Sequence, residues 1–272
     1  MERACPDPDL TTLPPNLHGY TGSIRRTVLP PQGCNYCVWL VEAERGWFVL
    51  KTSDSAAKIA SLTQEALVLN ALAPYRPHIP RFIAREDDLF LFSFLAGTDL
   101  ATRVASETDP AIRETLMFAQ GEFLREVHGW QPEFPHPADW LDHALHRCRA
   151  HVSREGYGAD EFSIHAGKTN PELVEYLQVN RAGISPRLVW GHGDWCLPNI
   201  LSDGMRITGA IDWADGGYAD YRYDLATGLW TLRRNLTGDP NLPRYMQAFL
   251  NGYGYDGDPA ELTYFEAIYA LY

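Results

Sequence analysis

The chain has 272 residues, of which 45% are apolar and 12% aromatic, so it can bury a large core and is not intrinsically disordered. Its 23 Lys and Arg stand against 35 Asp and Glu, a net charge of −12 that disfavours nucleic acid and anionic membrane surfaces as partners. The first residues lack the apolar stretch of a secretory signal, and no apolar run approaches the roughly 18 residues that cross a bilayer. A cytoplasmic protein is therefore expected.

The five cysteines are odd in number and widely spaced, which does not indicate a disulfide framework. Cys34 and Cys37 form a C-x-x-C pair, but the segment around them is predicted to be a strand, in which residues three apart point to opposite faces. No second Cys or His pair lies at zinc spacing. Neither a metal nor a redox role of this pair is favoured.

The first part of the chain is rich in strands and contains one long helix. Strands are predicted at residues 23–29, 34–43, 47–51 and 89–94. Glu44-Arg45-Gly46 is typical of a tight hairpin connection between the second and third. Apolar residues recurring every three or four positions predict a helix over residues 55–72, which Ala73-Pro74 ends.

From residue 98 onward helices dominate. Asp109-Pro110 combines an N-cap with a proline at the first helical position, and Asn170-Pro171 repeats this pattern. Further helices are predicted at 140–152, 221–236, 242–253 and 259–269, and short strands at 187–190, 199–202 and 206–211. Because strands and helices are segregated, we expect an α+β fold with lobes at residues 1–94 and 98–272 and a linker at 95–97.

The most informative stretch is His192-Gly193-Asp194-Trp195-Cys196-Leu197-Pro198-Asn199, which is followed by Ile211-Asp212-Trp213. It places an Asp at the start of a loop, an Asn five residues later and an Asp at the end of a following strand. Phosphoryl transfer from ATP requires this set, since one carboxylate orients the acceptor hydroxyl and two oxygen ligands hold magnesium.

This pattern resembles the aminoglycoside phosphotransferase family, whose fold is similar to that of protein kinases. The ending Cys196-Leu197-Pro198-Asn199 resembles the 3′-phosphotransferases in particular, as do the segments 217–220 and 223–226. The resemblance implies a bilobal, protein-kinase-like fold with Asp194 as the catalytic aspartate and Asn199 and Asp212 as magnesium ligands. Asp224 is expected to be structural and to cap the following helix.

The resemblance also assigns the N-terminal lobe to the nucleotide. Lys51 ends an apolar strand, as the family's ATP-phosphate lysine does, and Glu65 lies on the apolar side of its helix, where an unpaired carboxylate is costly. We therefore predict a Lys51–Glu65 ion pair. Gly33 lies where the family places its nucleotide loop, although G-x-G-x-x-G is absent. Phe94 and Ala96 belong to a segment that resembles the adenine-binding linker.

A protein acceptor is not expected, because eleven residues separate Asp212 from Asp224 and no Ala-Pro-Glu motif follows. A small, cationic, hydroxylated acceptor fits better. Tyr269 and Ala270 stand where the 3′-phosphotransferases have an acidic pair, so an aromatic C-terminus could bind a less charged acceptor. The predicted acceptor contacts are Asp160, Glu161, Glu266 and Tyr272, with Asp142, Glu155 and Glu261 as further candidates.

Three functions remain open at this point. The first is a magnesium-dependent kinase, monomeric or weakly dimeric, that phosphorylates an aminoglycoside hydroxyl with ATP or GTP and confers resistance, or its variant acting on another antibiotic or amino-alcohol metabolite. The second is a silent nucleotide-binding regulator. The third is a hydrolase using His192 and Cys196, which leaves the spacing of Asn199 and Asp212 unexplained. The kinase accounts for the whole pattern.

Overall fold

The structure is a computed structural model that describes residues 13–30, 36–152 and 159–271. The chain divides into two compact units. The first comprises Met1–Ala96 together with Ala210–Asp215, and the second comprises Gly97–Gly209 and Gly216–Tyr272. The short segment that carries Asp212 therefore belongs to the first unit, whereas the expected lobe boundaries put it in the second. The predicted α+β class is confirmed.

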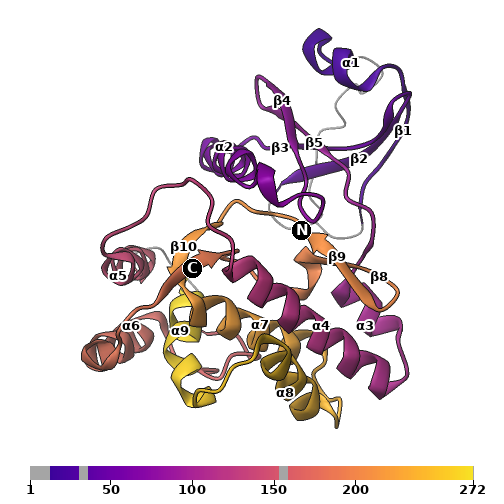
Figure 1. Cartoon of the computed structure of the whole chain (residues 1–272). Helices are drawn as coiled ribbons and strands as arrows, with labels where there is room; N and C mark the ends of the chain where they lie inside the picture. Colours follow the sequence, from indigo (N-terminus) through magenta and orange to yellow (C-terminus); the bar gives the residue numbers. More distant parts are fainter. Residues whose placement is uncertain (1–12, 31–35, 153–158, 272) are drawn as a thin grey trace. The chain divides into compact units, whose positions relative to one another are not determined.

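The first unit is built on a five-stranded antiparallel sheet with the order β1-β2-β3-β5-β4 (Figure 1). The strands are β1 (Ile24–Val28), β2 (Cys37–Ala43), β3 (Gly46–Thr52), β4 (Phe82–Glu86) and β5 (Leu89–Ser93). Ala43 pairs with Gly46, so Glu44 and Arg45 form the expected hairpin turn. β4 was not predicted, because a five-residue segment ending in Arg85-Glu86 gives no apolar alternation.

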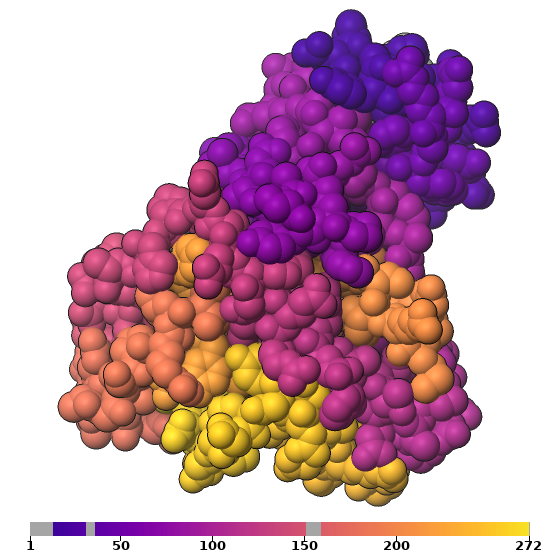
Figure 2. Space-filling view, in the orientation of Figure 1, coloured from indigo at the N-terminus to yellow at the C-terminus, as the bar shows by residue number. Residues whose placement is uncertain are grey.

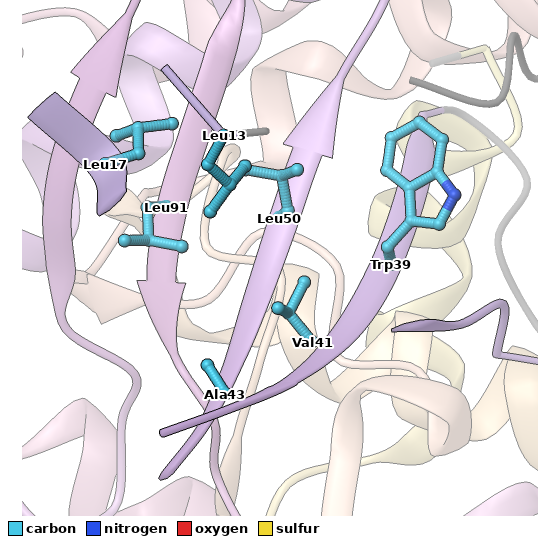
Figure 3. Close-up of a cluster of buried hydrophobic side chains, with 7 residues drawn as sticks. All are labelled: Leu13, Leu17, Trp39, Val41, Ala43, Leu50 and Leu91. Carbon is cyan, nitrogen blue, oxygen red and sulfur yellow. The ribbon is translucent and has the colours of Figure 1, made fainter. Parts of the chain in front are cut away.

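Among the described residues of this unit, two helices accompany the sheet: α1 (Pro15–Thr21) and α2 (Ala56–Ala71), the latter followed by the 3-10 helix η1 (Ala73–Tyr75). The bounds of α2 agree with the predicted helix to within one residue, whereas α1 was not predicted. Leu17 of α1 is fully buried against the sheet (Figure 3). Trp39, Val41 and Ala43 recur every second residue of β2 and so share the face that packs in this cluster.

The second unit is mainly helical. Its helices are α3 (Leu100–Ser106), α4 (Pro110–His128), α5 (Trp140–Val152), α6 (Asn170–Asn180), α7 (Tyr221–Asn235), α8 (Leu242–Tyr253) and α9 (Leu262–Tyr269), with 3-10 turns η2 (Arg181–Gly183), η3 (Leu197–Asn199) and η4 (Pro259–Glu261). The Asp109 carboxylate accepts from the Ala111 amide, which confirms the predicted cap. At α6 the cap is Thr169, one residue earlier than predicted, and it donates twice to Glu172.

Two small sheets complete the second unit. β7 (Leu188–Gly191) pairs with β10 (Gly217–Asp220), and β8 (Ile200–Asp203) lies between β6 (Thr98–Asp99) and β9 (Arg206–Ala210). The loop with Asp194 thus begins at the end of one sheet and enters the other. Segments at the yellow end of the colour scale form part of the surface of this unit (Figure 2), whereas the residues of α9 from Tyr264 to Ile268 are buried.

Cysteine bonding differs from expectation at one residue. Cys37 is disulfide-bonded, which the odd count and wide spacing did not predict. Cys148 and Cys196 are buried thiols. No described helix combines the length and apolarity of a membrane span.

Candidate active site

The first unit contains the predicted ion pair. Lys51 Nζ donates to both carboxylate oxygens of Glu65 at 2.8 Å, and to Asp212 Oδ1 at 3.2 Å. The side chain of Glu65 is 2% exposed and that of Lys51 11%, whereas Asp212 remains 36% exposed. Lys51 at the end of β3 is therefore bound to one buried and one accessible carboxylate, and the prediction of a Lys51–Glu65 pair is confirmed.

Electrostatics keep Lys51 charged. Burial by itself would lower the pKa of the ammonium, but the negative charges of Asp212 and Glu65 outweigh burial and raise it. The rings of Tyr36 and Phe92 lie 5.8 and 5.4 Å from Nζ and add cation–π attraction. The result is a fixed cation suited to an anionic group such as a phosphate.

The backbone at Asp212 lies in the left-handed region, with φ of 64°. A residue other than glycine pays about 1–3 kcal/mol for such a conformation, which is found preferentially at functional sites. Its neighbours hold the segment, since Trp213 Nε1 donates to the Ala210 carbonyl at 2.9 Å and the Ala210 amide donates to the His78 carbonyl at 3.0 Å. The partly exposed carboxylate of Asp212 is therefore presented by a rigid turn.

In the second unit, Asp194 and Asn199 are joined directly. Asn199 Nδ2 donates to Asp194 Oδ2 at 2.8 Å and to the Asp194 carbonyl at 3.0 Å. Because both bonds use the amide nitrogen, the amide oxygen of Asn199 is not consumed and can serve a hard cation. The 3-10 helix η3 makes this five-residue spacing compact enough for the contact.

The other oxygen of Asp194 accepts two further bonds that the sequence did not reveal. Cys196 Sγ lies 2.8 Å and the Tyr269 hydroxyl 3.1 Å from Oδ1. Burial, reinforced by the charge of Asp194, raises the pKa of the Cys196 thiol well above its usual value. Cys196 is therefore a protonated donor and not an activated nucleophile, which disfavours the hydrolase hypothesis.

Asp224 anchors the loop instead of capping a helix. Its carboxylate accepts from the amides of His192 at 2.7 Å and Gly193 at 2.9 Å, and it lies 3.1 Å from His128 Nε2. Burial acts to raise the pKa of Asp224, but hydrogen bonds and charge from His128 and His192 outweigh it, so the pKa is lowered. The N-cap of α7 is Asp220, so the predicted capping role of Asp224 is wrong.

His192 also orders this loop. Its Nδ1 accepts from the Asp194 amide at 3.2 Å, and the imidazole is fully buried. Together with the bonds to Asp224, this leaves the backbone of residues 192–194 tied at three successive amides. Nothing in the local sequence points to Asp224 as the anchor, because it lies about thirty residues away and is brought in by β10 and α7.

Two predicted acceptor carboxylates hold the protein's own structure. Glu266 is 3% exposed and accepts from Ser163 Oγ, the Ile164 amide and Arg233. Asp160 Oδ1 accepts from Trp230 Nε1 at 3.0 Å and from two amides of its own loop. Its Oδ2 lies 3.5 Å from Arg234. The ionic partners of both carboxylates are thus arginines of α7, and this geometry does not support an ammonium contact.

The remaining predicted residues divide by accessibility. Glu161 is exposed, as an acceptor contact requires. Phe94 is 37% exposed and its ring lies 5.9 Å from that of Trp47, while Ala96 ends the first unit. Gly33 and Tyr272 lie outside the described residues, as does Glu155. Asp142 is paired with Arg181 at 3.0 Å on the surface.

An antiparallel sheet bearing a Lys–Glu pair and a helical unit bearing an Asp–Asn loop define the class of kinase-like phosphotransferases. The profile of the phosphotransferase enzyme family matches residues 31–265, and the chain belongs to this family.

Individual relatives agree with this assignment. An aminoglycoside 3′-phosphotransferase of Niallia circulans is 29% identical over 179 residues, 65% of either chain. A probable aminoglycoside 3′-phosphotransferase of Lactococcus lactis is 31% identical over 119 residues, which are 43% of this chain and 44% of the relative. The aligned part thus spans less than two thirds of the length of these relatives.

Solved structures share the fold. An aminoglycoside 3′-phosphotransferase of type VIII superposes with a TM-score of 0.75 at 22% identity and covers 94% of this chain and 97% of its own. The aminoglycoside phosphotransferase APH(3″)-Id of Streptomyces rimosus, in complex with ADP and streptomycin, superposes with a TM-score of 0.69 at 21% identity, covering 89% and 94%. At these identities the similarity establishes the architecture alone.

Proposed function

We propose that the protein is a kinase that transfers the γ-phosphate of ATP or GTP to a hydroxyl of an aminoglycoside antibiotic and so confers resistance. The observation that carries this proposal is the Asp194–Asn199 pair, in which the asparagine nitrogen holds the carboxylate and leaves its own oxygen for a cation. Family membership and the names of the relatives support the choice of acceptor. We further propose a cytoplasmic monomer or weak dimer that needs neither nucleic acid nor a membrane.

The chemistry of the donors fits magnesium. Asn199 offers an amide oxygen and Asp212 a partly exposed carboxylate, and Mg²⁺ prefers such oxygens together with phosphates and water. We assign both residues as its ligands. When bound, magnesium would neutralise charge on the nucleotide phosphates. Lys51, held by Glu65, would bind the phosphates, and Gly33, Phe94 and Ala96 are the proposed further nucleotide contacts.

Asp194 receives the proton of the acceptor hydroxyl during the transfer. The acceptor hydroxyl donates to its carboxylate, and the hydroxyl oxygen attacks the γ-phosphorus as the bond to the bridging β–γ oxygen breaks. The proton passes to Asp194, and the nucleoside diphosphate leaves with the bridging oxygen. His192, Gly193 and Asp224 keep the loop in place, so the carboxylate needs little rearrangement when the acceptor arrives.

The acceptor is the finer part of the proposal. The Streptomyces rimosus structure contains streptomycin and ADP, and the net charge of −12 favours a cationic acceptor in this chain as well. Asp160 and Glu266 are paired with arginines, however, so Glu161 is the carboxylate among the predicted contacts that we assign to an ammonium group.

A coupled assay of nucleotide turnover with a panel of aminoglycosides and other amino-alcohols tests the function. We expect kanamycin-type aminoglycosides to raise turnover above the hydrolysis background, with an affinity that weakens in salt. Asp194→Ala should abolish nearly all turnover and leave nucleotide affinity intact, while Asp203→Asn, at the exposed last residue of β8, serves as the matched control. Wild-type turnover in Asp194→Ala would overturn the mechanism, and stimulation by other amino-alcohols alone would overturn the acceptor.

A further inference from the structure

Two donors from distant parts of the second unit reach the same oxygen of Asp194. Cys196 follows it in the loop, whereas Tyr269 lies in the last turn of α9. Asn199 holds the other oxygen. Rotating the carboxylate about its Cβ–Cγ bond would break all three bonds, so its plane is fixed by side chains that no local motif connects.

Packing determines where the Tyr269 hydroxyl lies. Its ring lies 5.1 Å from that of Trp230 and 6.2 Å from that of Tyr223, both edge-to-face and both on α7. Helices α7 and α9 are neighbours in the second unit (Figure 1). The phenol is therefore held by two aromatic contacts before its hydroxyl meets Asp194, and it acts as a rigid donor rather than a mobile one.

Both donors keep their protons at neutral pH. Burial raises the pKa of Tyr269 well above its usual value, and the neighbouring Cys196 and Asp194 add to this effect. Burial likewise raises the pKa of Cys196. A carboxylate oxygen has two lone pairs, and those of Oδ1 are both occupied by these donors. One lone pair of Oδ2 accepts the bond from Asn199, and the other is open. The acceptor's proton must then go to this open lone pair of Oδ2.

We propose that Tyr269 is a positioning residue for phosphoryl transfer: with Cys196 it fixes Oδ1 of Asp194 and thereby directs the open lone pair of Oδ2 at the acceptor hydroxyl. This inference rests on the proposed function, in which Asp194 receives that proton. Tyr269 does not touch the acceptor. Because the Tyr269 hydroxyl orients the base, its removal should lower kcat and leave acceptor binding unchanged.

Tyr269→Phe is the direct test, because it keeps the ring between Trp230 and Tyr223 and removes only the hydroxyl. We expect kcat to fall about tenfold, since a hydrogen bond to a charged group is lost, while the acceptor KM changes less than about twofold. Cys196→Ala should lower kcat in the same way, and Cys196→Ser, which retains a donor, should restore most of it. Tyr264→Phe is the control, because Tyr264 lies on the same helix and its hydroxyl donates to the Leu177 carbonyl instead of Asp194.

Four outcomes of these kinetic tests would overturn the inference. An unchanged kcat in Tyr269→Phe means that the hydroxyl does not position Asp194. A rise in acceptor KM with kcat unchanged means that it binds the acceptor instead. A rise in kcat means that it occupies the acceptor's place. A similar loss of kcat in Tyr264→Phe would make the effect one of helix stability.

A readout without an acceptor separates this inference from the proposed function. The S–H stretching band of Cys196, assigned by difference infrared spectra against Cys196→Ala, reports the bond to the Asp194 carboxylate. Tyr269→Phe should shift this band because the carboxylate reorients, and an unchanged band removes the inference. If the wild type transfers phosphate to no acceptor of the panel, the proposed function fails, whereas a fully active Tyr269→Phe leaves it intact.

Discussion

Lys51 donates to both oxygens of Glu65 inside the first unit, and the same ammonium reaches the accessible carboxylate of Asp212. A buried carboxylate thus fixes a cation at the point where a nucleotide phosphate is proposed to bind. The pair does two things at once, since removing either partner leaves a buried charge and also changes the nucleotide site.

Glu65→Gln tests this double role. We expect the free energy of unfolding to fall by about 3–5 kcal/mol in urea denaturation, and nucleotide affinity by isothermal titration to weaken because Lys51 is no longer held. Glu42→Gln is the control in the same unit, since Glu42 pairs with the exposed Arg26 and should cost about 0–1 kcal/mol. Equal losses in the two variants would contradict the assignment.

Asp224→Asn should change how stability depends on pH. The folded pKa of Asp224 is lowered, so its contribution is present above the unfolded value near 4 and is lost as pH falls below about 4 toward the folded pKa. Urea denaturation between pH 3 and about 7 should therefore give a shallower acid decline in Asp224→Asn than in the wild type. Asp142→Asn, which alters an exposed carboxylate, should keep the wild-type decline. An identical acid decline in Asp224→Asn would show that the loop anchor carries no pH-dependent stability.

Gly252→Ala should destabilise the second unit. A Cβ at this position of α8 would overlap the backbone carbonyl of Phe118 in α4, and backbone atoms cannot move aside as a flexible side chain can. We expect the free energy of unfolding, measured by thermal or urea denaturation, to fall by about 1–3 kcal/mol or more. A Cβ at Gly183 would meet nothing within 4 Å, so Gly183→Ala should stay within about 0.5 kcal/mol of the wild type. If the two variants unfold alike, the close crossing of α4 and α8 is wrong.

Glu266→Gln separates structure from recognition. Because its carboxylate is buried against Arg233 and Ser163, we expect the melting temperature to fall while the acceptor KM stays within about twofold. Glu161→Gln, at an exposed carboxylate of the adjoining loop, should instead raise the acceptor KM and leave the melting temperature unchanged. The reverse pattern would return Glu266 to the acceptor site.

Much of the fold could be read from local pattern. The helices with a clear cap or apolar period agree with prediction, since α2 matches the predicted bounds to within one residue and α4 begins at Pro110 after its predicted cap. β4 and α1 were not predicted, because short elements gain their stability from the sheet against which they pack and not from their own periodicity. Asp224 was recognised as structural, but its partners were misjudged, since sequence separation hides which backbone amides a carboxylate will reach.

Residue types and their spacing were enough to indicate the chemistry. The spacing of Asp194, Asn199 and Asp212 indicates phosphoryl transfer, and a charged residue on an apolar helix face needs a partner, which identified the Lys51–Glu65 pair. The folded chain was needed to show which carboxylates are already neutralised, as Glu266 is by Arg233, and which hydroxyl reaches the base, as that of Tyr269 does. A residue's type limits the bonds it can form, whereas long-range packing selects the partner with which it forms them.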